Sequence, residues 1–242
     1  MKTLILTTAA LALSAGMALA QSQTIRMGTE GAYPPYNFLN DKGEVDGFER
    51  ELGDELCKRA ELTCEWVTTD WDGIIPNLVS GNYDTIIAGM SITAERDEVI
   101  DFTQNYMPPA ASAYAGLNAD VDVATGVIAA QATTIQAGHV AASGATLLEF
   151  ATPEETVASV RNGEADAVFA DKDYLVPIVE ESGGELTFVG EDVPLGGGIG
   201  IGLRESDTEL RAKFDAAIQT MKDDGTLNRM IVKWFGEGAA TF

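Results

Sequence analysis

Residues that bind metals or nucleic acids are scarce in this sequence. Its 242 residues include one histidine and two cysteines, fewer than the four ligands of a structural zinc site. Lysine and arginine number 15 against 38 aspartates and glutamates, which gives a formal net charge of −23. So acidic a chain repels a phosphate backbone. We therefore expect no metal, no cofactor and no nucleic-acid partner.

Long apolar runs are also scarce. After residue 20, no stretch is apolar over the roughly 20 residues that a membrane-spanning helix needs. Residues 1–20 join Lys2 to a short apolar run and end on Ala-Leu-Ala. This pattern is typical of a signal peptide cleaved after Ala20, with a membrane anchor or a buried helix as the alternative. We therefore expect a soluble, exported protein.

The motifs of common catalytic centres are missing. The sequence contains no G-x-S-x-G, no H-E-x-x-H and no phosphate-binding G-x-x-x-x-G-K. The glycine run 196–198 lacks the strand-then-helix context of a dinucleotide site. No motif therefore predicts an enzyme.

The two cysteines, Cys57 and Cys64, stand seven residues apart. In an exported protein such a pair is expected to form a disulfide, and metal binding is the alternative. A short-loop disulfide would stabilise the fold by roughly 2–3 kcal/mol, so its role is structural.

Short apolar runs alternate with amphipathic patterns along the chain, which predicts an α/β fold. Helix N-termini are predicted at Thr93 and, from capping-box spacing, at Thr152 with Glu155 and at Ser206 with Glu209. The expected strands are 24–29, 64–68, 84–89, 125–130, 165–170 and 198–203, and the expected helices include 47–60, 72–80, 94–98, one ending near 162, one ending at 225 and one ending at 235.

Two segments share one pattern. GNYDTIIAG (81–89) and GEADAVFAD (163–171) align without gaps, each with a glycine, an aspartate three residues later and then an apolar strand. Ligands of open α/β sheets bind beyond the carboxyl ends of strands. Since these strands end at Gly89 and Asp171, the pattern predicts two α/β lobes whose strand ends face one cleft. A chance match is the alternative.

Charged groups near these strand ends match the two poles of a free amino acid. Arg96, in the first turn of the helix after Ser91, can bind a carboxylate through two parallel hydrogen bonds. Thr133 and Thr134 can donate to the same carboxylate, and Asp171 can accept the ammonium group. A surface ion pair for Arg96, and helix capping for the threonines and Asp171, are the alternatives.

Aromatic residues stand at nearby junctions between elements. Tyr33, Tyr36 and Trp71 can form the walls of a pocket and stack on a flat or cationic group. Simple packing is the alternative for all three.

Six segments in order carry a resemblance that covers essentially the whole chain after residue 20. They resemble the polar amino-acid family of periplasmic solute-binding proteins, the binding subunits of ABC importers. The L-C-K-R…C pairing at residues 56–64 is similar to the arginine- and lysine/arginine/ornithine/histidine-binding branch. The six segments are GTEGAYPPY (28–36), GFEREL (47–52), WDGIIPNL (71–78), AGMSITAER (88–96), IDFT (100–103) and DGTL with KWFG (224–236).

The resemblance implies the two-lobed, type II periplasmic-binding-protein fold. Lobe 1 would comprise residues 21–108 and 197–242, and lobe 2 residues 109–196, joined by two hinge strands near 106–110 and 194–198. The implied protein is a monomer in the periplasm that closes on a free amino acid and delivers it to the membrane subunits of an ABC transporter.

The resemblance also implies roles for single residues. Arg96 would bind the α-carboxylate and Asp171 the α-ammonium, while Glu30 would face the end of a side chain held between Tyr33 and Trp71. No residue would be catalytic. The implied ligand-binding set is Glu30, Tyr33, Trp71, Gly89, Met90, Ser91, Arg96, Thr133, Thr134 and Asp171.

Glu30 and the two aromatic residues favour a basic ligand, namely arginine, lysine, ornithine or histidine. A polar neutral amino acid such as glutamine is the alternative, because glutamine-binding relatives also carry an acid near this position. The alternative of another class is a periplasmic cyclohexadienyl-type dehydratase on the same fold. A soluble receptor that feeds a sensor is a third interpretation.

Overall fold

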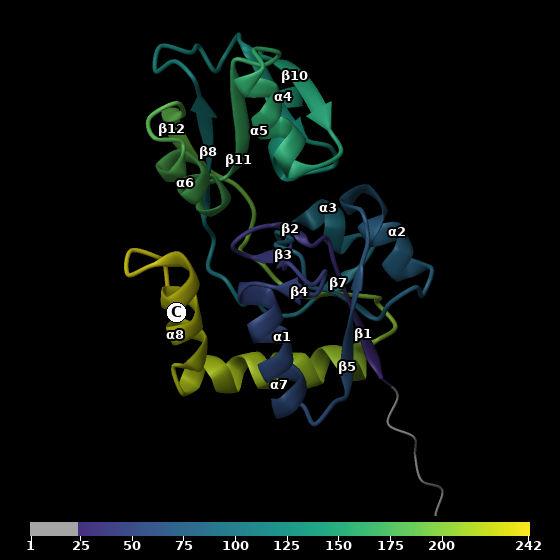
Figure 1. The fold of residues 1–242 in the computed structure, drawn as a ribbon. Helices are drawn as coiled ribbons and strands as arrows, with labels where there is room; N and C mark the ends of the chain where they lie inside the picture. The colour runs from purple at the N-terminus through teal and green to yellow at the C-terminus, as the bar shows by residue number, and fades with distance from the viewer. Residues whose placement is uncertain (1–23) are drawn as a thin grey trace, which may run out of the picture.

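The computed structural model describes residues 24–242. The expected signal peptide, residues 1–20, lies outside the described residues. Figure 1 shows two α/β bodies, one above the other, with the chain passing between them twice. Within residues 24–242, no helix has both the length and the apolar character to cross a membrane.

The first body is built on a five-stranded sheet. The second strand from one edge pairs in parallel with both of its neighbours, and two antiparallel pairs complete the other edge. In spatial order the strands are β5 (Cys64–Thr68), β1 (Ile25–Thr29), β6 (Thr85–Ile86), β13 (Gly202–Leu203) and β7 (Asp101–Phe102).

Helices bury both faces of this sheet. One core cluster joins β1 to α1 (Phe48–Arg59), α7 (Thr208–Asp223) and α8 (Thr226–Phe235). A second cluster joins β6 to the 3-10 turn η1 (Trp71–Gly73) and to α2 (Ile74–Val79). On α7, Phe214, Ile218 and Met221 are buried and Leu210 is partly buried against the same core.

The second body has a five-stranded sheet of the same kind. β9 pairs in parallel with β10 and β11, and β8 pairs antiparallel with β11 and β12. The order is β10 (Thr146–Phe150), β9 (Val127–Gln131), β11 (Ala167–Asp171), β8 (Ala111–Gly116) and β12 (Thr187–Pro194). Its helices are α4 (Ile135–Ala141), α5 (Pro153–Arg161) and α6 (Lys172–Glu181).

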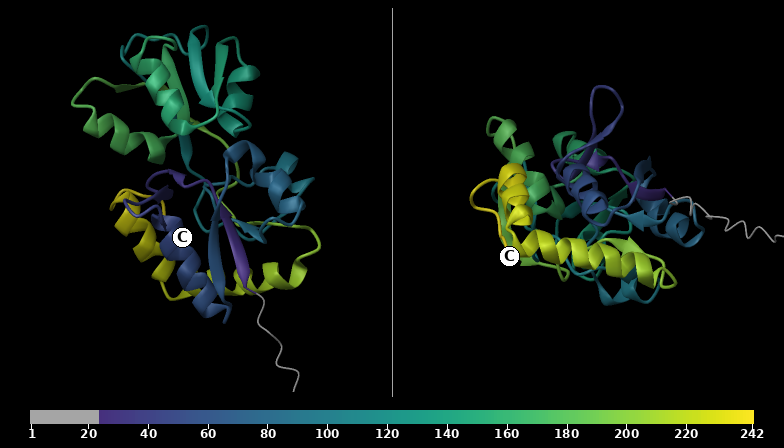
Figure 2. Two further views of the ribbon diagram at one scale, coloured as in Figure 1. Left: turned by 45° about the vertical axis from the view of Figure 1, so that its right-hand side comes forward. Right: turned by 90° about the horizontal axis from the view of Figure 1, so that it is seen from below.

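Two segments connect the bodies, one after β7 and one after β12, and Figure 2 shows them from a second side. After Pro194, which ends β12, the expected hinge strands near 106–110 and 194–198 are irregular chain, and the β-bridge between Met107 and Ile199 links the two segments. Pro108 and Pro109 have no N–H groups, so a longer ladder cannot form there.

Two of the three helix N-termini predicted from the sequence are confirmed, and one is wrong. The N-cap at Thr93 and the capping box of Thr152 with Glu155 are confirmed. The box at Ser206 with Glu209 is wrong, because α7 begins one residue later, at Thr208, with Asp207 as its N-cap. The Ser206 hydroxyl instead donates to the Asp207 carboxylate, 3.2 Å away.

The expected disulfide between Cys57 and Cys64 is present and ties the last turn of α1 to the start of β5. A small antiparallel sheet and a short helix complete the first body. They are β2 (Ala32–Tyr33), β3 (Asn37–Leu39), β4 (Val45–Asp46) and α3 (Ala94–Asp97).

The two segments that share a sequence pattern also share a structural role. The Asp84 carboxylate accepts the backbone N–H of Arg26, at 3.0 Å, where β1 begins. The Asp166 carboxylate accepts the backbone N–H of Val127, at 2.8 Å, where β9 begins. Each aspartate therefore accepts a backbone N–H near the start of the neighbouring parallel strand, and the shared sequence pattern has a structural counterpart.

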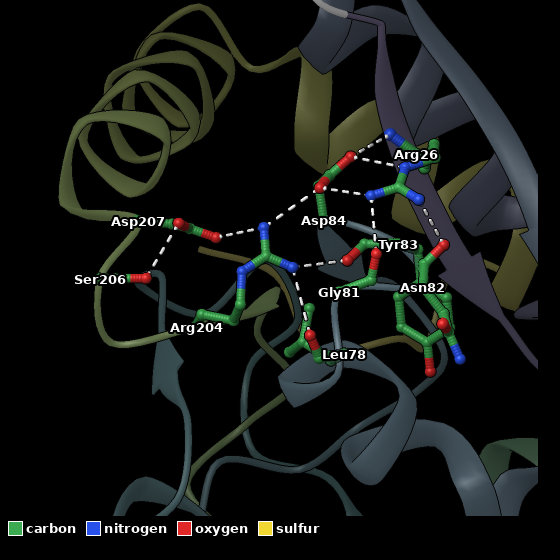
Figure 3. Close-up of polar contacts among 9 residues, drawn as sticks. All are labelled: Arg26, Leu78, Gly81, Asn82, Tyr83, Asp84, Arg204, Ser206 and Asp207. Carbon is green, nitrogen blue, oxygen red and sulfur yellow. Dashed lines mark hydrogen bonds and ion pairs between the residues drawn. The ribbon is translucent and has the colours of Figure 1, made fainter.

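Asp84 has a second role that Asp166 lacks (Figure 3). Its carboxylate is nearly buried, and the Nη2 atoms of Arg26 and Arg204 lie 3.0 Å and 3.1 Å from its Oδ1 atom. Burial alone would raise the pKa of Asp84, but hydrogen bonds from Arg26 and Arg204 outweigh that effect and hold the pKa below its ordinary value. The aspartate thus joins β1, β6 and the chain entering α7.

We expect Asp84→Asn to lower the free energy of unfolding by about 2–3 kcal/mol, because an amide would turn an N–H group toward two guanidinium groups. Asp166→Asn is the matched control. Its carboxylate is exposed and holds no arginine, so a loss of about 1 kcal/mol or less is expected. Urea denaturation at pH 7 measures both, and equal losses would contradict the role of the arginines.

Candidate ligand-binding site

A cavity lies between the two bodies. Its lining comes from the residues that follow β1 and β6 in the first body and from the ends of β9 and β11 in the second. This is the edge at which parallel strands present their carboxyl ends. The lining residues are Glu30, Tyr33, Trp71, Ala88, Gly89, Ser91, Arg96, Gln131, Thr134, Ile135, Gln136 and Asp171.

Arg96 supplies the positive charge of the cavity. It lies on α3, whose first turn is fixed by the Thr93 hydroxyl, which accepts the Arg96 backbone N–H at 3.2 Å. Its Nη1 atom donates to the Ser91 carbonyl at 2.9 Å, and its guanidinium carbon lies 5.4 Å from the centre of the Trp71 ring.

The Arg96 guanidinium is not engaged in an ion pair. Within residues 24–242, no carboxylate lies within 4.0 Å of it, so the surface ion pair with a neighbouring acid is not formed. Burial lowers the pKa of Arg96 to about 10, and the group therefore stays charged at neutral pH. It is suited to binding an anion.

Asp171 supplies a negative charge from the second body. Tyr33 donates its hydroxyl to Oδ2 at 2.9 Å, and Gln136 donates its amide to Oδ1 at 2.9 Å. The carboxylate makes no capping bond to α6, so the capping alternative is not met. Burial raises the pKa of Asp171 to about 6, although the bond from Tyr33 opposes this.

Glu30 supplies a second negative charge, from the first body. Gln131 of the second body donates to its Oε1 atom at 2.6 Å and also to the Ala151 carbonyl at 3.0 Å. Burial raises the pKa of Glu30 to about 7, despite the bond from Gln131. The carboxylates of Asp70 and Asp72 raise it further, and no cationic side chain contributes to the shift.

Two aromatic rings limit the space around these charges. Trp71 is 7% exposed, and Tyr33 stacks on Tyr174 of the second body with ring centres 4.3 Å apart. Tyr36 is fully buried, and it donates to Asp173 at 3.3 Å without lining the cavity. The packing alternative therefore holds for Tyr36.

Eight of the ten residues expected to bind ligand line the cavity, and two do not. Met90 is fully buried in the core between α2 and β6. Thr133 adopts a left-handed backbone, with φ at 58°, and its hydroxyl donates to Asp72 at 3.4 Å. Its carbonyl, rather than its hydroxyl, faces Arg96, with the Nη2 atom 3.4 Å away.

Thr134 has two roles. It lines the cavity, but its hydroxyl also accepts the backbone N–H of Ala137 at 3.1 Å as the N-cap of α4. The capping alternative therefore applies to it.

Sequence reasoning missed Gln131 and Gln136. Gln131 ends β9, so the strand-end rule that selected Asp171 could have found it. Gln136 lies in the first turn of α4 and reaches Asp171 and Ser112 only through the fold, so no sequence signal marks it.

The family model for bacterial extracellular solute-binding proteins, family 3, matches residues 25–237. A solved structure is similar along its whole length. It is a periplasmic His/Glu/Gln/Arg/opine family-binding protein from Silicibacter pomeroyi in complex with lysine, 78% identical, with a TM-score of 0.89 over 90% of this chain and 100% of that chain.

Two relatives of described function are more distant. The octopine-binding periplasmic protein of Rhizobium meliloti is 33% identical over 94% of this chain and 95% of its own. The lysine/arginine/ornithine-binding periplasmic protein of Escherichia coli (strain K12) is 30% identical over 93% and 95%. The chain described here belongs to family 3 of the bacterial extracellular solute-binding proteins.

Proposed function

We propose that this protein binds a free basic amino acid and delivers it to the membrane subunits of an ABC transporter. One observation carries the proposal. The cavity holds one cation, Arg96, and two acids, Asp171 and Glu30. A basic amino acid at neutral pH carries the complementary set, one carboxylate and two cations. Lysine, arginine and ornithine carry this set at neutral pH, and histidine does so only when its imidazole is protonated. The lysine-bound relative supports lysine.

Each group has a defined role in this proposal. The Arg96 guanidinium binds the α-carboxylate together with donors from Ser91 and Thr134, and Asp171 accepts the α-ammonium beside the Gly89 carbonyl. Glu30 accepts the cationic end of the side chain, which lies between Tyr33 and Trp71. We leave Met90 and Thr133 out of the direct contacts, because neither lines the cavity.

Binding is proposed to involve closure of two lobes, comprising residues 21–108 with 197–242 and residues 109–196. The cavity is lined from both bodies, and Tyr33–Asp171 and Gln131–Glu30 hydrogen bonds span it. A ligand could therefore enter only if the bodies separate. The segments near 106–110 and 194–198 would bend.

The protein is proposed to work as a monomer in the periplasm, after removal of residues 1–20. The relatives that are named as periplasmic binding proteins support this location. We infer that no chemical step follows binding, because Arg96 and Asp171 suit a zwitterion. Turnover of prephenate or arogenate by the pure protein would favour the dehydratase instead.

Replacing Arg96 by alanine should weaken the binding of every amino acid by at least about a hundredfold, because all of them share the α-carboxylate. Titration calorimetry measures this on protein that has been unfolded and refolded to remove carried-over ligand. Arg50→Ala is the control, since Arg50 is on the surface and pairs only with Asp54. Unchanged lysine binding by Arg96→Ala would reject the proposed orientation.

The preference for lysine over glutamine should depend on pH. A bound ammonium favours the ionised form of Glu30, so below pH 7 lysine binding must first remove its proton. Lysine affinity relative to glutamine should then fall, by up to about tenfold per pH unit, between pH 7 and pH 5. The titration of Asp171, whose pKa is about 6, affects the binding of both ligands alike. The ratio of the two affinities therefore reports on Glu30 alone.

Glu30→Gln provides the matched control for this titration, because it has the same shape and does not ionise. Its lysine-to-glutamine ratio should be lower at pH 7 and independent of pH. Calorimetry at several pH values measures both proteins. Full lysine affinity in Glu30→Gln would instead support the alternative ligand class, a polar neutral amino acid such as glutamine.

A further inference from the structure

One carboxylate of the first body lies outside the cavity and yet contacts its wall. Glu49, in the GFEREL segment, stands in the first turn of α1 and is fully buried. It accepts the Gly89 backbone N–H at 2.6 Å and the Asn37 amide at 2.7 Å, and it also accepts the Tyr106 hydroxyl. All three partners are neutral donors. A buried carboxylate without a cationic partner is costly, so its presence calls for an explanation beyond packing.

Two of these bonds lead to the cavity. Gly89 lines it, and its backbone is in the left-handed region with φ at 63°. Asn37 links Glu49 to Gly31, because its Oδ1 atom accepts the Gly31 backbone N–H at 2.7 Å. Gly31 directly follows Glu30. One carboxylate therefore fixes the backbone beside both Glu30 and Gly89.

The third bond leads to the segments that connect the bodies. Tyr106 lies in the first of them, and its backbone N–H donates to the Ile199 carbonyl of the second at 2.8 Å. The next residue, Met107, forms the β-bridge with Ile199. The Glu49 carboxylate is thus linked to Gly89, to the backbone that follows Glu30, and to the point where the chain crosses between the two bodies.

We propose that Glu49 is a positioning residue for ligand binding. It sets Glu30 and Gly89 relative to each other and to the connecting segments, without touching the ligand itself. This inference rests on the proposed function. Its physical basis is that three directed, charge-assisted hydrogen bonds, one from a backbone N–H and two from side chains, hold their donors more tightly than apolar packing does.

The test compares Glu49→Gln with Asp84→Asn. Glutamine keeps the shape of Glu49 but turns an N–H group toward at least one of three donors. We expect it to shift the amide resonances of Gly89 and Gly31 in nitrogen–proton NMR spectra of the ligand-free protein. We also expect it to weaken lysine binding by about tenfold or more in calorimetry. Asp84→Asn lowers stability far from the cavity and should change neither.

Two results would overturn the proposal. The first is a Glu49→Gln protein with unchanged Gly89 and Gly31 resonances and full lysine affinity. The second is an equal loss of affinity in Asp84→Asn, because the effect would then follow stability and not position. If the wild-type protein fails to bind lysine, the proposed function fails, and the ligand-free amide comparison still decides the role of Glu49.

Asn37→Leu separates the two branches and replaces Glu49→Gln if that variant does not fold. It removes the link to Gly31 and leaves the bond to Gly89. We expect a shifted Gly31 resonance, an unshifted Gly89 resonance and weaker binding of lysine. The reason is that only the backbone next to Glu30 loses its hydrogen bond. Unchanged lysine affinity in Asn37→Leu would overturn the inference.

Discussion

The cavity depends on the direction of four strands. β1 and β6 run in parallel in the first body, and β9 and β11 do so in the second, so the four carboxyl ends meet at one place between the bodies. Strands buried on both faces carry few charged side chains along their length, and Arg26 near the start of β1 is paired with Asp84. The charged groups therefore stand at the ends, where Glu30 follows β1, Arg96 lies beyond β6 and Asp171 closes β11. At the opposite ends, Asp84 and Asp166 accept backbone N–H groups near the start of β1 and β9.

Grouping these charges in a largely enclosed space has an electrostatic cost. Burial raises the pKa values of Glu30 and Asp171 and lowers that of Arg96, and in each case the charged form is the one disfavoured. Gln131 and Tyr33 offset only part of this cost through neutral hydrogen bonds. A ligand with opposite charges at the right places supplies what these side chains cannot. In the proposed function, the uncompensated charge that destabilises the ligand-free cavity also makes binding selective for a ligand of complementary charge.

The fold class and most residues of the candidate site could be predicted from the sequence. Physical reasons explain both what could be predicted and what could not. Alternating strands and helices fix the fold class because burial imposes their periods, and the aspartate pattern marked Gly89 and Asp171 because each follows a buried strand. The two- and three-residue strands β2 to β4 are too short to leave a period. Contacts such as Gln136 with Asp171, or Glu49 with Gly89, join residues 35 and 40 positions apart. Spacing along the chain does not give them. The capping box at Ser206 is absent because α7 begins one residue later, with Asp207 at the N-cap position and no side-chain capping bond.

The two chain crossings also limit the ways in which the bodies can move. A single linker would leave one body free to swivel and twist about the other. Two crossings, joined by the Met107–Ile199 bridge, oppose twisting and sliding and leave bending about the line between them as the easiest motion. In the proposed closure, most of the orientational entropy of bringing the two halves of the cavity together is then lost when the chain folds, before any ligand arrives. The search for the closed arrangement becomes a motion along one coordinate.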